Sequence, residues 1–227
     1  MIDFNNLIDK YLERDIRLKQ VGRYYPSEAG YCLRKSWYSF KYPVKTEPEK
    51  LRVFEVGRVL HDFMVDVFQS DKTPVKLLQS EVPIKLEFPD FLVSGRIDDL
   101  ILVLENGELL LVEVKSTTYL PKDSPKPEHV MQLQLYLHSM GVRKGVVLYL
   151  EKATLQTKSF PIDYDEKAAM KIIDRFRLLD KDLKNNTLPA PEAKQVPEMG
   201  WLCNYCEYRA KCDANEGAPS DAEQKTL

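Results

Sequence analysis

Two acidic residues and one lysine, placed on either side of a turn sequence, are the side chains of this chain best suited to chemistry. Asn106-Gly107 lies between two apolar runs, and this dipeptide strongly favours a two-residue β-hairpin turn. Asp98 precedes the turn, and Glu113 and Lys115 follow it. In such a hairpin Asp98 lies opposite Lys115, and Glu113 shares their side because alternate strand residues share a face. We therefore expect a candidate site on that face, at the open end of the hairpin.

This cluster has two interpretations, which the residues alone leave open. It could be a cross-strand salt bridge at the end of a sheet, although a simple ion pair needs no second carboxylate. Alternatively, Asp98 and Glu113 bind Mg²⁺ or Mn²⁺, and Lys115 orients a water molecule or offsets charge on a phosphate. The second interpretation predicts phosphodiester hydrolysis. Asp99 and Val114 are expected on the opposite face, with Asp99 as a structural or surface residue.

The hydrophobic pattern predicts an α/β fold that brings these residues together. Helices are expected over residues 3–20, 32–40 (with Ser27 as its N-cap), 51–68, 129–140 and 165–184. Strands are expected over 75–88, in the hairpin at 94–115, and over 146–150 and 155–160. Residues 116–129 contain three prolines and should form an exposed loop beside the site. We expect one domain over residues 1–212, with helices flanking a mixed central sheet, and a disordered tail over 213–227.

Composition narrows the functional classes. The chain has 227 residues, of which 44% are hydrophobic and 30% charged, as in ordinary globular proteins. No apolar run reaches membrane-spanning length, and the N-terminal residues lack the apolar core of a signal peptide. We therefore expect a cytoplasmic protein with no membrane partner. A formal net charge of −2 permits a nucleic-acid substrate but does not argue for one.

The four cysteines indicate a metal centre. Cys203, Cys206 and Cys212 form a C-x2-C-x5-C motif, and Cys32 is the one remaining cysteine. A buried cysteine can act as a small hydrophobic residue, which suits Cys32 alone but not three clustered cysteines among polar residues. Four cysteines bind either tetrahedral Zn²⁺ or an iron–sulfur cluster. The one-plus-three spacing favours a cluster, because structural zinc sites usually use two local pairs.

Five motifs in order resemble one nuclease family. They are Cys32-Leu33-Arg34-Lys35; Gly57-Arg58 with His61; Gly95-Arg96-Ile97-Asp98 followed by Glu113-Val114-Lys115; Gln132-x3-Tyr136; and the C-x2-C-x5-C motif. This pattern resembles the RecB-type branch of the PD-(D/E)xK nuclease superfamily, and within it the CRISPR-associated Cas-four exonucleases. The resemblance spans residues 32–212. Ile97 departs from the proline in the superfamily's name, as is common in the RecB-type branch.

The resemblance implies roles for these residues. It implies a restriction-endonuclease-like fold in which a 4Fe-4S cluster, held by Cys32, Cys203, Cys206 and Cys212, joins the two ends of the chain. It also implies Mg²⁺ or Mn²⁺ bound by His61, Asp98, Glu113 and the carbonyl of Val114. Lys115 would be catalytic, and Gln132 and Tyr136 would position either the substrate or that lysine. His129, His138 and Asp99 are interpreted as structural or surface residues.

The function implied is a metal-dependent DNA exonuclease that acts mainly on single-stranded DNA, 5′ to 3′, in CRISPR spacer acquisition. The CRISPR integrase complex would then be a partner, and a homo-oligomer remains open. Two alternatives are a RecB-like repair or phage-type nuclease, and a non-catalytic adaptor that binds single strands. The substrate is expected to contact basic residues beside the motifs, which are Arg34, Lys35, Arg58, Arg96, Lys122 and Lys126.

Overall fold

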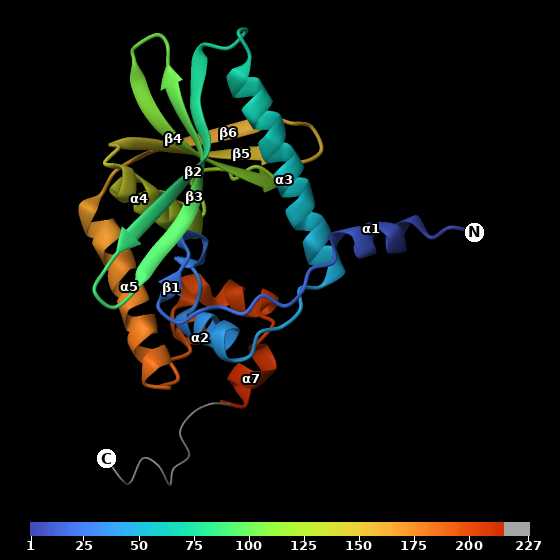
Figure 1. Ribbon diagram of the computed structural model, residues 1–227, viewed down its shortest axis with the longest axis vertical. Coiled ribbons are helices and arrows are strands. Elements are labelled where there is room, and N and C mark those ends of the chain that lie inside the picture. The colour runs from blue at the N-terminus through green and yellow to red at the C-terminus, as the bar shows by residue number, and fades with distance from the viewer. Residues whose placement is uncertain (216–227) are drawn as a thin grey trace.

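The hairpin predicted around Asn106-Gly107 forms the centre of a six-stranded mixed sheet (Figure 1). In the computed structural model, which describes residues 1–215, its strands are β3 (Leu92–Val103) and β4 (Glu108–Thr117). β1 (Arg23–Tyr24) and β2 (Val75–Glu87) both pair with β3, and β5 (Lys144–Glu151) and β6 (Thr157–Asp163) continue the sheet beyond β4. β1–β3 and β4–β5 are parallel, and the other pairs are antiparallel. The expected mixed α/β fold is confirmed.

The expected two-residue turn is wrong. Val103 pairs with Glu108, so residues 104–107 form a four-residue loop, which the Gly107 N–H closes by donating to the Val103 carbonyl at 2.9 Å. A type I′ turn needs a positive φ at both central residues, and here only Gly107 (φ +70°) has one, not Asn106. The register shifts by two residues, which leaves every side chain on the face expected for it.

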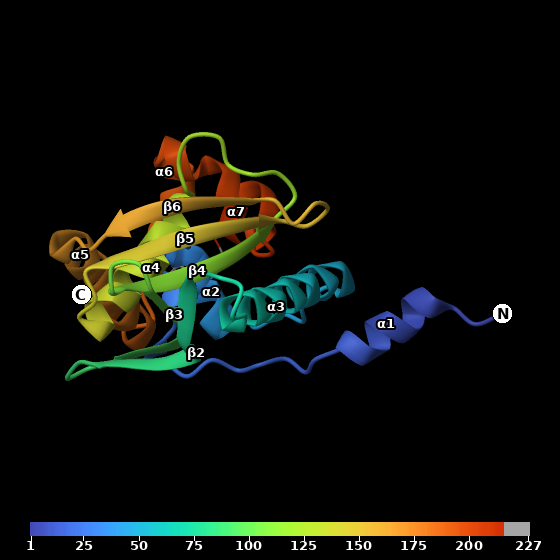
Figure 2. The same ribbon diagram turned by 90° about the horizontal axis from the view of Figure 1, so that it is seen from above.

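The two faces of the sheet are covered by different helices (Figure 2). α3 (Pro48–Gln69) packs its Met64 and Phe68 against Val112 and Leu150. α4 (Pro127–Met140) packs against the opposite face, where Leu111 and Val147 lie, because strand side chains alternate between faces. α5 (Glu166–Lys184) and α4 pack together on this second side.

Residues 26–41 and the C-terminal part of the described chain form one lobe. α2 (Leu33–Lys41) follows a short η1 (Pro26–Glu28), and the C-terminal part comprises α6 (Glu192–Gln195), η2 (Pro197–Tyr205) and α7 (Arg209–Asp213). Tyr38 of α2 stacks on Tyr208, with ring centroids 5.7 Å apart. This lobe also touches α4, because a Cβ placed on Gly30 would lie only 2.3 Å from the Cβ of Glu128.

Most expected helices and strands are confirmed within a few residues. The first helix is shorter than expected: α1 is Phe4–Leu12, and the chain from Glu13 to Val21 is not helical. The short length agrees with the packing of the helix. A helix in a protein is stabilised mainly by packing on the rest of the chain, and in α1 only Leu12 is buried. The first residues of the expected tail belong to the fold, as Asn215 bonds to Arg34. The rest of that tail, 216–227, lies outside the described residues.

Among the described residues, no helix is both long enough and apolar enough to span a membrane.

The tight packing of Gly145 in β5 gives a test of this fold. A Cβ at this position would lie 2.9 Å from the backbone oxygen of Leu111 and 3.0 Å from Leu133. Gly145→Ala should therefore lower the free energy of unfolding by about 1–3 kcal/mol, because a neighbouring strand cannot easily move away. Urea denaturation measures this change. Gly57→Ala is the matched control, since in α3 its nearest contact is Ser116 Oγ at 3.5 Å and it should stabilise by about 0.5–1 kcal/mol.

Candidate active site

The site lies where β3 separates from β4. The β3–β4 ladder ends at Asp99, and β2 occupies the other edge of β3 along its length. β1 pairs with β3 only at Leu92 and Val93, so no strand within residues 1–215 covers residues 94–98 on the site edge. The Asp98 side chain bridges this opening, since its Oδ2 accepts a hydrogen bond from the Val114 N–H at 2.8 Å. A carboxylate thus takes the place of a strand partner.

The neighbouring strand is distorted at the same level. Glu81 of β2 has a φ of +53°, which is rare for a residue other than glycine, and the flanking pairs Ser80–Asp99 and Val82–Ile97 place it across from Asp98. Ser80 Oγ donates to the Asp98 carbonyl at 3.3 Å. Such strained backbone persists where the surrounding structure holds it, and it concentrates at functional sites.

Glu113 carries a buried carboxylate that the protein does not fully satisfy. The Lys115 ammonium lies 2.5 Å from Oε1, and no other donor among residues 1–215 reaches either oxygen of the fully buried side chain. Burial, and then the negative charge of Asp98, raises the pKa of Glu113. Burial also raises the pKa of Asp98, although Lys115 and His61 oppose this shift. Two carboxylates thus share one side with a single ammonium, which leaves room for another positive charge.

Lys115 is held in place from α4. Its Nζ donates to Gln132 Oε1 at 3.2 Å, and Gln132 Nε2 donates to the Tyr136 hydroxyl at 3.0 Å. Tyr136 is almost fully buried, so it cannot touch a substrate in this arrangement. Burial lowers the pKa of Lys115, but the Glu113 and Asp98 carboxylates outweigh it and leave that pKa raised. Of the two roles expected for Gln132 and Tyr136, the contacts fit the positioning of the lysine.

His61 of α3 contacts Asp99 directly, and not Asp98. Its Nε2 lies 3.3 Å from Asp99 Oδ2, and this hydrogen bond, against the effect of burial, raises the His61 pKa to about 9. Asp99 is fully buried, so of the two interpretations given for it, structural or surface, the surface one is wrong. The sequence held a partial signal, because Asp99 lies within the apolar strand between Ile97 and Ile101, where a buried charge needs a partner, but it did not identify that partner as His61.

The donor set fits a divalent cation, although the ligands are not gathered into a closed shell. No group of three or more His, Cys, Asp or Glu side chains in residues 1–215 is placed to hold a metal ion. Two buried carboxylate oxygens nevertheless have no partner in this part of the chain, Oδ1 of Asp99 and Oε2 of Glu113, and Glu113 Oε1 has only the Lys115 ammonium. Hard oxygen donors of this kind suit Mg²⁺ or Mn²⁺. Buried carboxylate oxygens therefore lie beside Asp98, and the positive charge of His61 acts on Asp98 by lowering its pKa.

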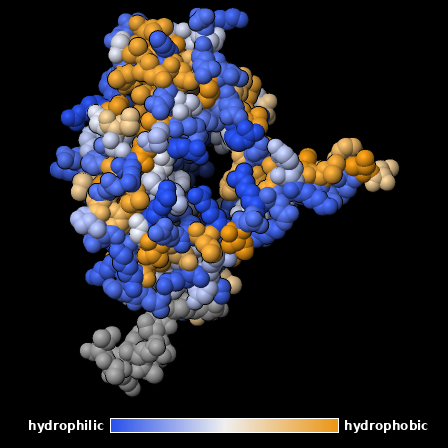
Figure 3. Space-filling model, viewed as in Figure 1, coloured by the Kyte–Doolittle hydropathy of each residue, from blue (hydrophilic) through white to orange (hydrophobic). Residues whose placement is uncertain are grey.

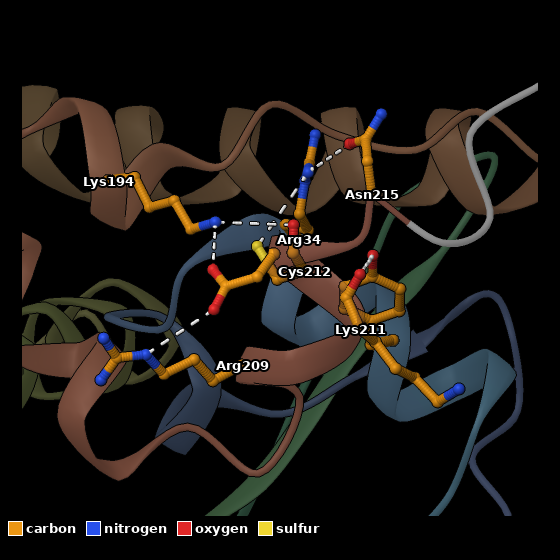
Figure 4. Close-up of polar contacts among 8 residues, drawn as sticks. Arg34, Lys194, Arg209, Lys211, Cys212 and Asn215 are labelled. Atoms are coloured by element: carbon orange, nitrogen blue, oxygen red, sulfur yellow. Dashed lines mark hydrogen bonds and ion pairs between the residues drawn. The ribbon is translucent and has the colours of Figure 1, made fainter.

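The four cysteines line one cavity in the lobe formed by the two ends of the chain. The lining also includes four basic side chains, which are Arg34, Lys35, Lys194 and Arg209. Figure 4 shows Arg34 and Lys194 approaching Cys212, with the Arg34 Nη1 at 4.0 Å from its sulfur and the Lys194 Nζ at 3.5 Å from its carbonyl oxygen. Basic groups around thiols favour the thiolate form that binds metals.

The cysteine cavity fits a thiolate-bound centre by its donors and its charge. Four thiolates carry four negative charges, and the basic side chains around them can compensate these charges. Burial raises the pKa of Cys206, against the lowering effect of Lys35. As placed, no three of the four cysteines within the described residues form a group that could hold a metal ion. The cavity is thus a shared location for the four side chains rather than a completed ligand shell.

The six basic residues expected to contact a substrate lie in different environments. Arg34 is buried, and its guanidinium donates to the Pro189 carbonyl at 2.6 Å and to Asn215 at 2.8 Å. Lys35 pairs with Glu207 at 3.2 Å, and Arg58 and Arg96 pair with acidic neighbours on the surface. The side chains of Lys122 and Lys126 are exposed in the loop before α4. Arg34 therefore has a structural environment, whereas the other five side chains are at least partly exposed.

Comparison with known proteins gives consistent matches along the chain. A family model described as the PD-(D/E)XK nuclease superfamily matches residues 7–213. The CRISPR-associated exonuclease Cas4 of Saccharolobus solfataricus is 22% identical over 216 residues, covering 92% of this chain and 96% of that protein.

Two solved structures share the fold. The structure of SSO0001 aligns with a TM-score of 0.61 at 18% identity, covering 92% of this chain and 95% of that chain. An alkaline exonuclease from Laribacter hongkongensis aligns with a TM-score of 0.50 at 14% identity, covering 82% and 93%.

The His61–Asp99 contact predicts a stability effect that the sequence alone did not suggest. His61→Ala should lower the free energy of unfolding by about 2–4 kcal/mol, because it leaves a buried carboxylate without its partner. The double variant His61→Ala/Asp99→Ala should be no less stable than His61→Ala, which a double-mutant cycle by urea denaturation measures. Asp62→Ala is the control, since Asp62 lies next on α3 and pairs only with the exposed Arg58. Additive losses would show that the two side chains do not interact.

Proposed function

The chain belongs to the PD-(D/E)XK nuclease superfamily, and on this basis we propose that it is a metal-dependent DNA exonuclease acting on single strands. One observation carries the proposal. Glu113 is fully buried, has Lys115 as its one close partner among the described residues, and lies beside Asp98 at the uncovered edge of β3. A pair of carboxylates with one lysine is the set that metal-assisted phosphodiester hydrolysis requires.

We assign the roles in the reaction as follows. Asp98 and Glu113 would hold Mg²⁺ or Mn²⁺, with the carbonyl of Val114 and, by the resemblance, His61 as further ligands. To bind the ion, His61 would have to lose a proton and give up its contact with Asp99. When bound, such an ion would supply polarisation of the phosphate and a lowered pKa of a water molecule. Lys115, held by Gln132, orients the attacking water or offsets the negative charge that develops on the phosphate.

Action from a strand end is proposed from the similarity to the Cas4 exonuclease of S. solfataricus. Figure 3 shows a hollow in this face, between α3 and the body of the protein, with hydrophilic residues along part of its border. The 5′ to 3′ direction is proposed from the resemblance to the Cas-four exonucleases.

A role in CRISPR spacer acquisition, alongside the integrase complex, is supported by the similarity to the Cas4 exonuclease of S. solfataricus. The fold shared with an alkaline exonuclease keeps a second candidate, a RecB-like repair or phage-type nuclease. A non-catalytic adaptor is the weakest candidate, because Asp98, Glu113 and Lys115 are all present and lie on one face of the sheet. Co-purification with the integrase separates the first two candidates.

The catalytic proposal is tested at Lys115. Lys115→Ala should lower the rate of single-strand degradation with Mn²⁺ at least about 100-fold, because it removes the one ammonium beside the two carboxylates. Binding of single strands in Ca²⁺ should change little. Degradation of an end-labelled oligonucleotide, with and without chelator, measures the rate.

Lys144→Ala is the matched control for that experiment. Lys144 lies on the adjacent strand β5 and pairs with Glu108 at the sheet surface, 2.5 Å away, so its loss should leave the rate unchanged. Gln132→Ala should give an intermediate loss of roughly 10-fold, since it releases Lys115 without removing it. Wild-type degradation by Lys115→Ala would reject the assignment of the site.

We also propose that Cys32, Cys203, Cys206 and Cys212 bind a 4Fe-4S cluster. The support is their common cavity, its basic lining, and the one-plus-three spacing. In this role the cluster would join α2 to the C-terminal segment, and it has no assigned redox step. Its contribution to folding would come from linking residues that are far apart in the sequence.

The cluster proposal predicts a composition. Protein purified without oxygen should be brown and contain iron and acid-labile sulfide, and Cys206→Ser should be colourless and less stable. Tyr205→Ala is the control, because this exposed neighbour lies between two of the cysteines in the same loop and its loss should preserve the colour. Stoichiometric zinc without sulfide would contradict the proposal.

Substrate capture is proposed for the exposed basic residues near the site. Lys122 and Lys126 lie in the loop after β4, and Arg96 lies on the uncovered stretch of β3. Lys35 and Arg58 could contribute by exchanging their acidic partners for phosphate. We leave Arg34 out of this group, because its guanidinium is buried in bonds to the C-terminal segment.

The dependence of binding on salt tests this group. Replacing Arg96, Lys122 and Lys126 with alanine should reduce the log–log salt slope for single-stranded DNA by roughly 0.7 for each lost phosphate contact. Fluorescence anisotropy in Ca²⁺ at several salt concentrations gives the slope. A variant with alanine at Lys167, Lys171 and Lys181, which are exposed on α5, controls for the change in net charge. Equal slopes in both triple variants would show that DNA enters elsewhere.

A further inference from the structure

α1 is attached to its own chain by its polar side. Asp9 makes a two-pronged ion pair with Arg52 of α3, at 2.7 and 2.8 Å, and Arg52 also donates to the Asn5 carbonyl at 3.4 Å. Leu12 is the one buried residue of the helix. A surface helix normally packs its apolar side on the core. Here the polar side is attached instead, and the apolar side is left exposed.

The apolar side of α1 faces solvent. Phe4, Leu7, Ile8 and Tyr11 follow the i, i+3, i+4, i+7 spacing of one helix face, and their exposed fractions lie between 48% and 84%. A helix of 9 residues is marginal in water by itself and depends on packing. One buried leucine and one partly exposed ion pair provide little of that packing.

α3 presents a second uncovered apolar stripe that starts at the same ion pair. Arg52, Val56, Val59 and Phe63 follow one line along this helix, at spacings of four, three and four residues. The exposed fractions of Val56, Val59 and Phe63 lie between 40% and 51%. Arg52 is covered by α1, whereas the stripe beyond it is open.

The path of the chain holds α1 away from the body of the protein. Residues 13–21 contain no helix or strand, and Figure 2 shows α1 projecting beyond the end of α3 at the tip of this segment. An arm of this kind can reach a neighbouring molecule more easily than it can fold back on its own stripe.

We propose that the apolar faces of α1 and α3 form a dimer interface with a second copy of this chain, in which each α1 packs on the α3 stripe of the other copy. The pairing is two-fold, so each copy contributes both surfaces. With full side-chain areas of about 150–200 Å², the seven residues expose roughly 700 Å² on each copy, or about 1,400 Å² in the pair. Stable specific interfaces bury about 1,200–2,000 Å², so a second copy is a sufficient occupant.

Complementary variants test this pairing. The wild-type protein should be a dimer by analytical ultracentrifugation at micromolar concentration, and Leu7→Asp and Val59→Lys should each be monomeric. An equimolar mixture of these two variants should regain dimers, because the altered α1 of one then meets the altered α3 of the other. Leu104→Asp is the control, since Leu104 is equally exposed in the β3–β4 loop and lies off both surfaces.

Each outcome decides the proposal. A wild-type monomer at all concentrations, or dimers in both single variants, would overturn it, as would a mixture that stays monomeric. A monomer that sediments with anionic vesicles, and loses this with Leu7→Asp, would assign the face to lipid instead. Circular dichroism confirms that the variants fold, and their degradation of single strands separates this inference from the nuclease proposal.

Discussion

The structure depends on negative charge buried at the point where two central strands part. Glu113 is fully buried and Asp98 is half-buried beside the same ammonium, and Asp98 uses an oxygen to hold the Val114 N–H that β3 no longer pairs. Unpaired buried charge is expensive. The surrounding elements reduce this cost by fixing Lys115 from α4 and by placing His61 on α3 against the adjacent Asp99. Both helices that cover the sheet are thereby tied to the same few residues.

The two faces of the sheet thus carry different sets of polar side chains at the point where β3 and β4 separate. On the α4 side, Glu113, Lys115 and Gln132 form a connected set that ends in the buried hydroxyl of Tyr136. On the α3 side, the His61–Asp99 pair stands behind the opening. Where β3 separates from β4, charges on the two sides of the sheet shift one another's pKa values. The charge of Asp98 raises the pKa of Glu113 and that of Lys115 lowers it, and the charge of His61 lowers the pKa of Asp98.

Much of this arrangement could be predicted from the sequence, for reasons that particular residues make clear. The shared face of Asp98, Glu113 and Lys115 follows from strand periodicity, and it survived a wrong turn type because the register moved by two residues. The pairing of Asp99 with His61 could not be predicted, because it depends on how α3 crosses the sheet. The end of α1 at Leu12 and the burial of Arg34 depend likewise on packing partners distant in sequence. Local sequence patterns thus predict the helices, the strands and the face on which each side chain lies. Contacts between separate elements can be identified only in the folded structure.

The closure of the N-terminal lobe by the C-terminal segment has a consequence for synthesis on the ribosome. Arg34 donates hydrogen bonds to Pro189 and Asn215, and Tyr38 stacks on Tyr208. Because these partners are translated late, α2 cannot complete its packing until residues 189–215 have emerged from the ribosome. The strands and helices that carry Asp98, Glu113, Lys115 and Gln132 are translated long before that. Contacts of such long sequence separation form slowly. A nascent or prematurely ended chain would thus carry all four of these side chains while α2 lacked the C-terminal segment on which it packs, and chaperones and proteases act on such incompletely packed intermediates.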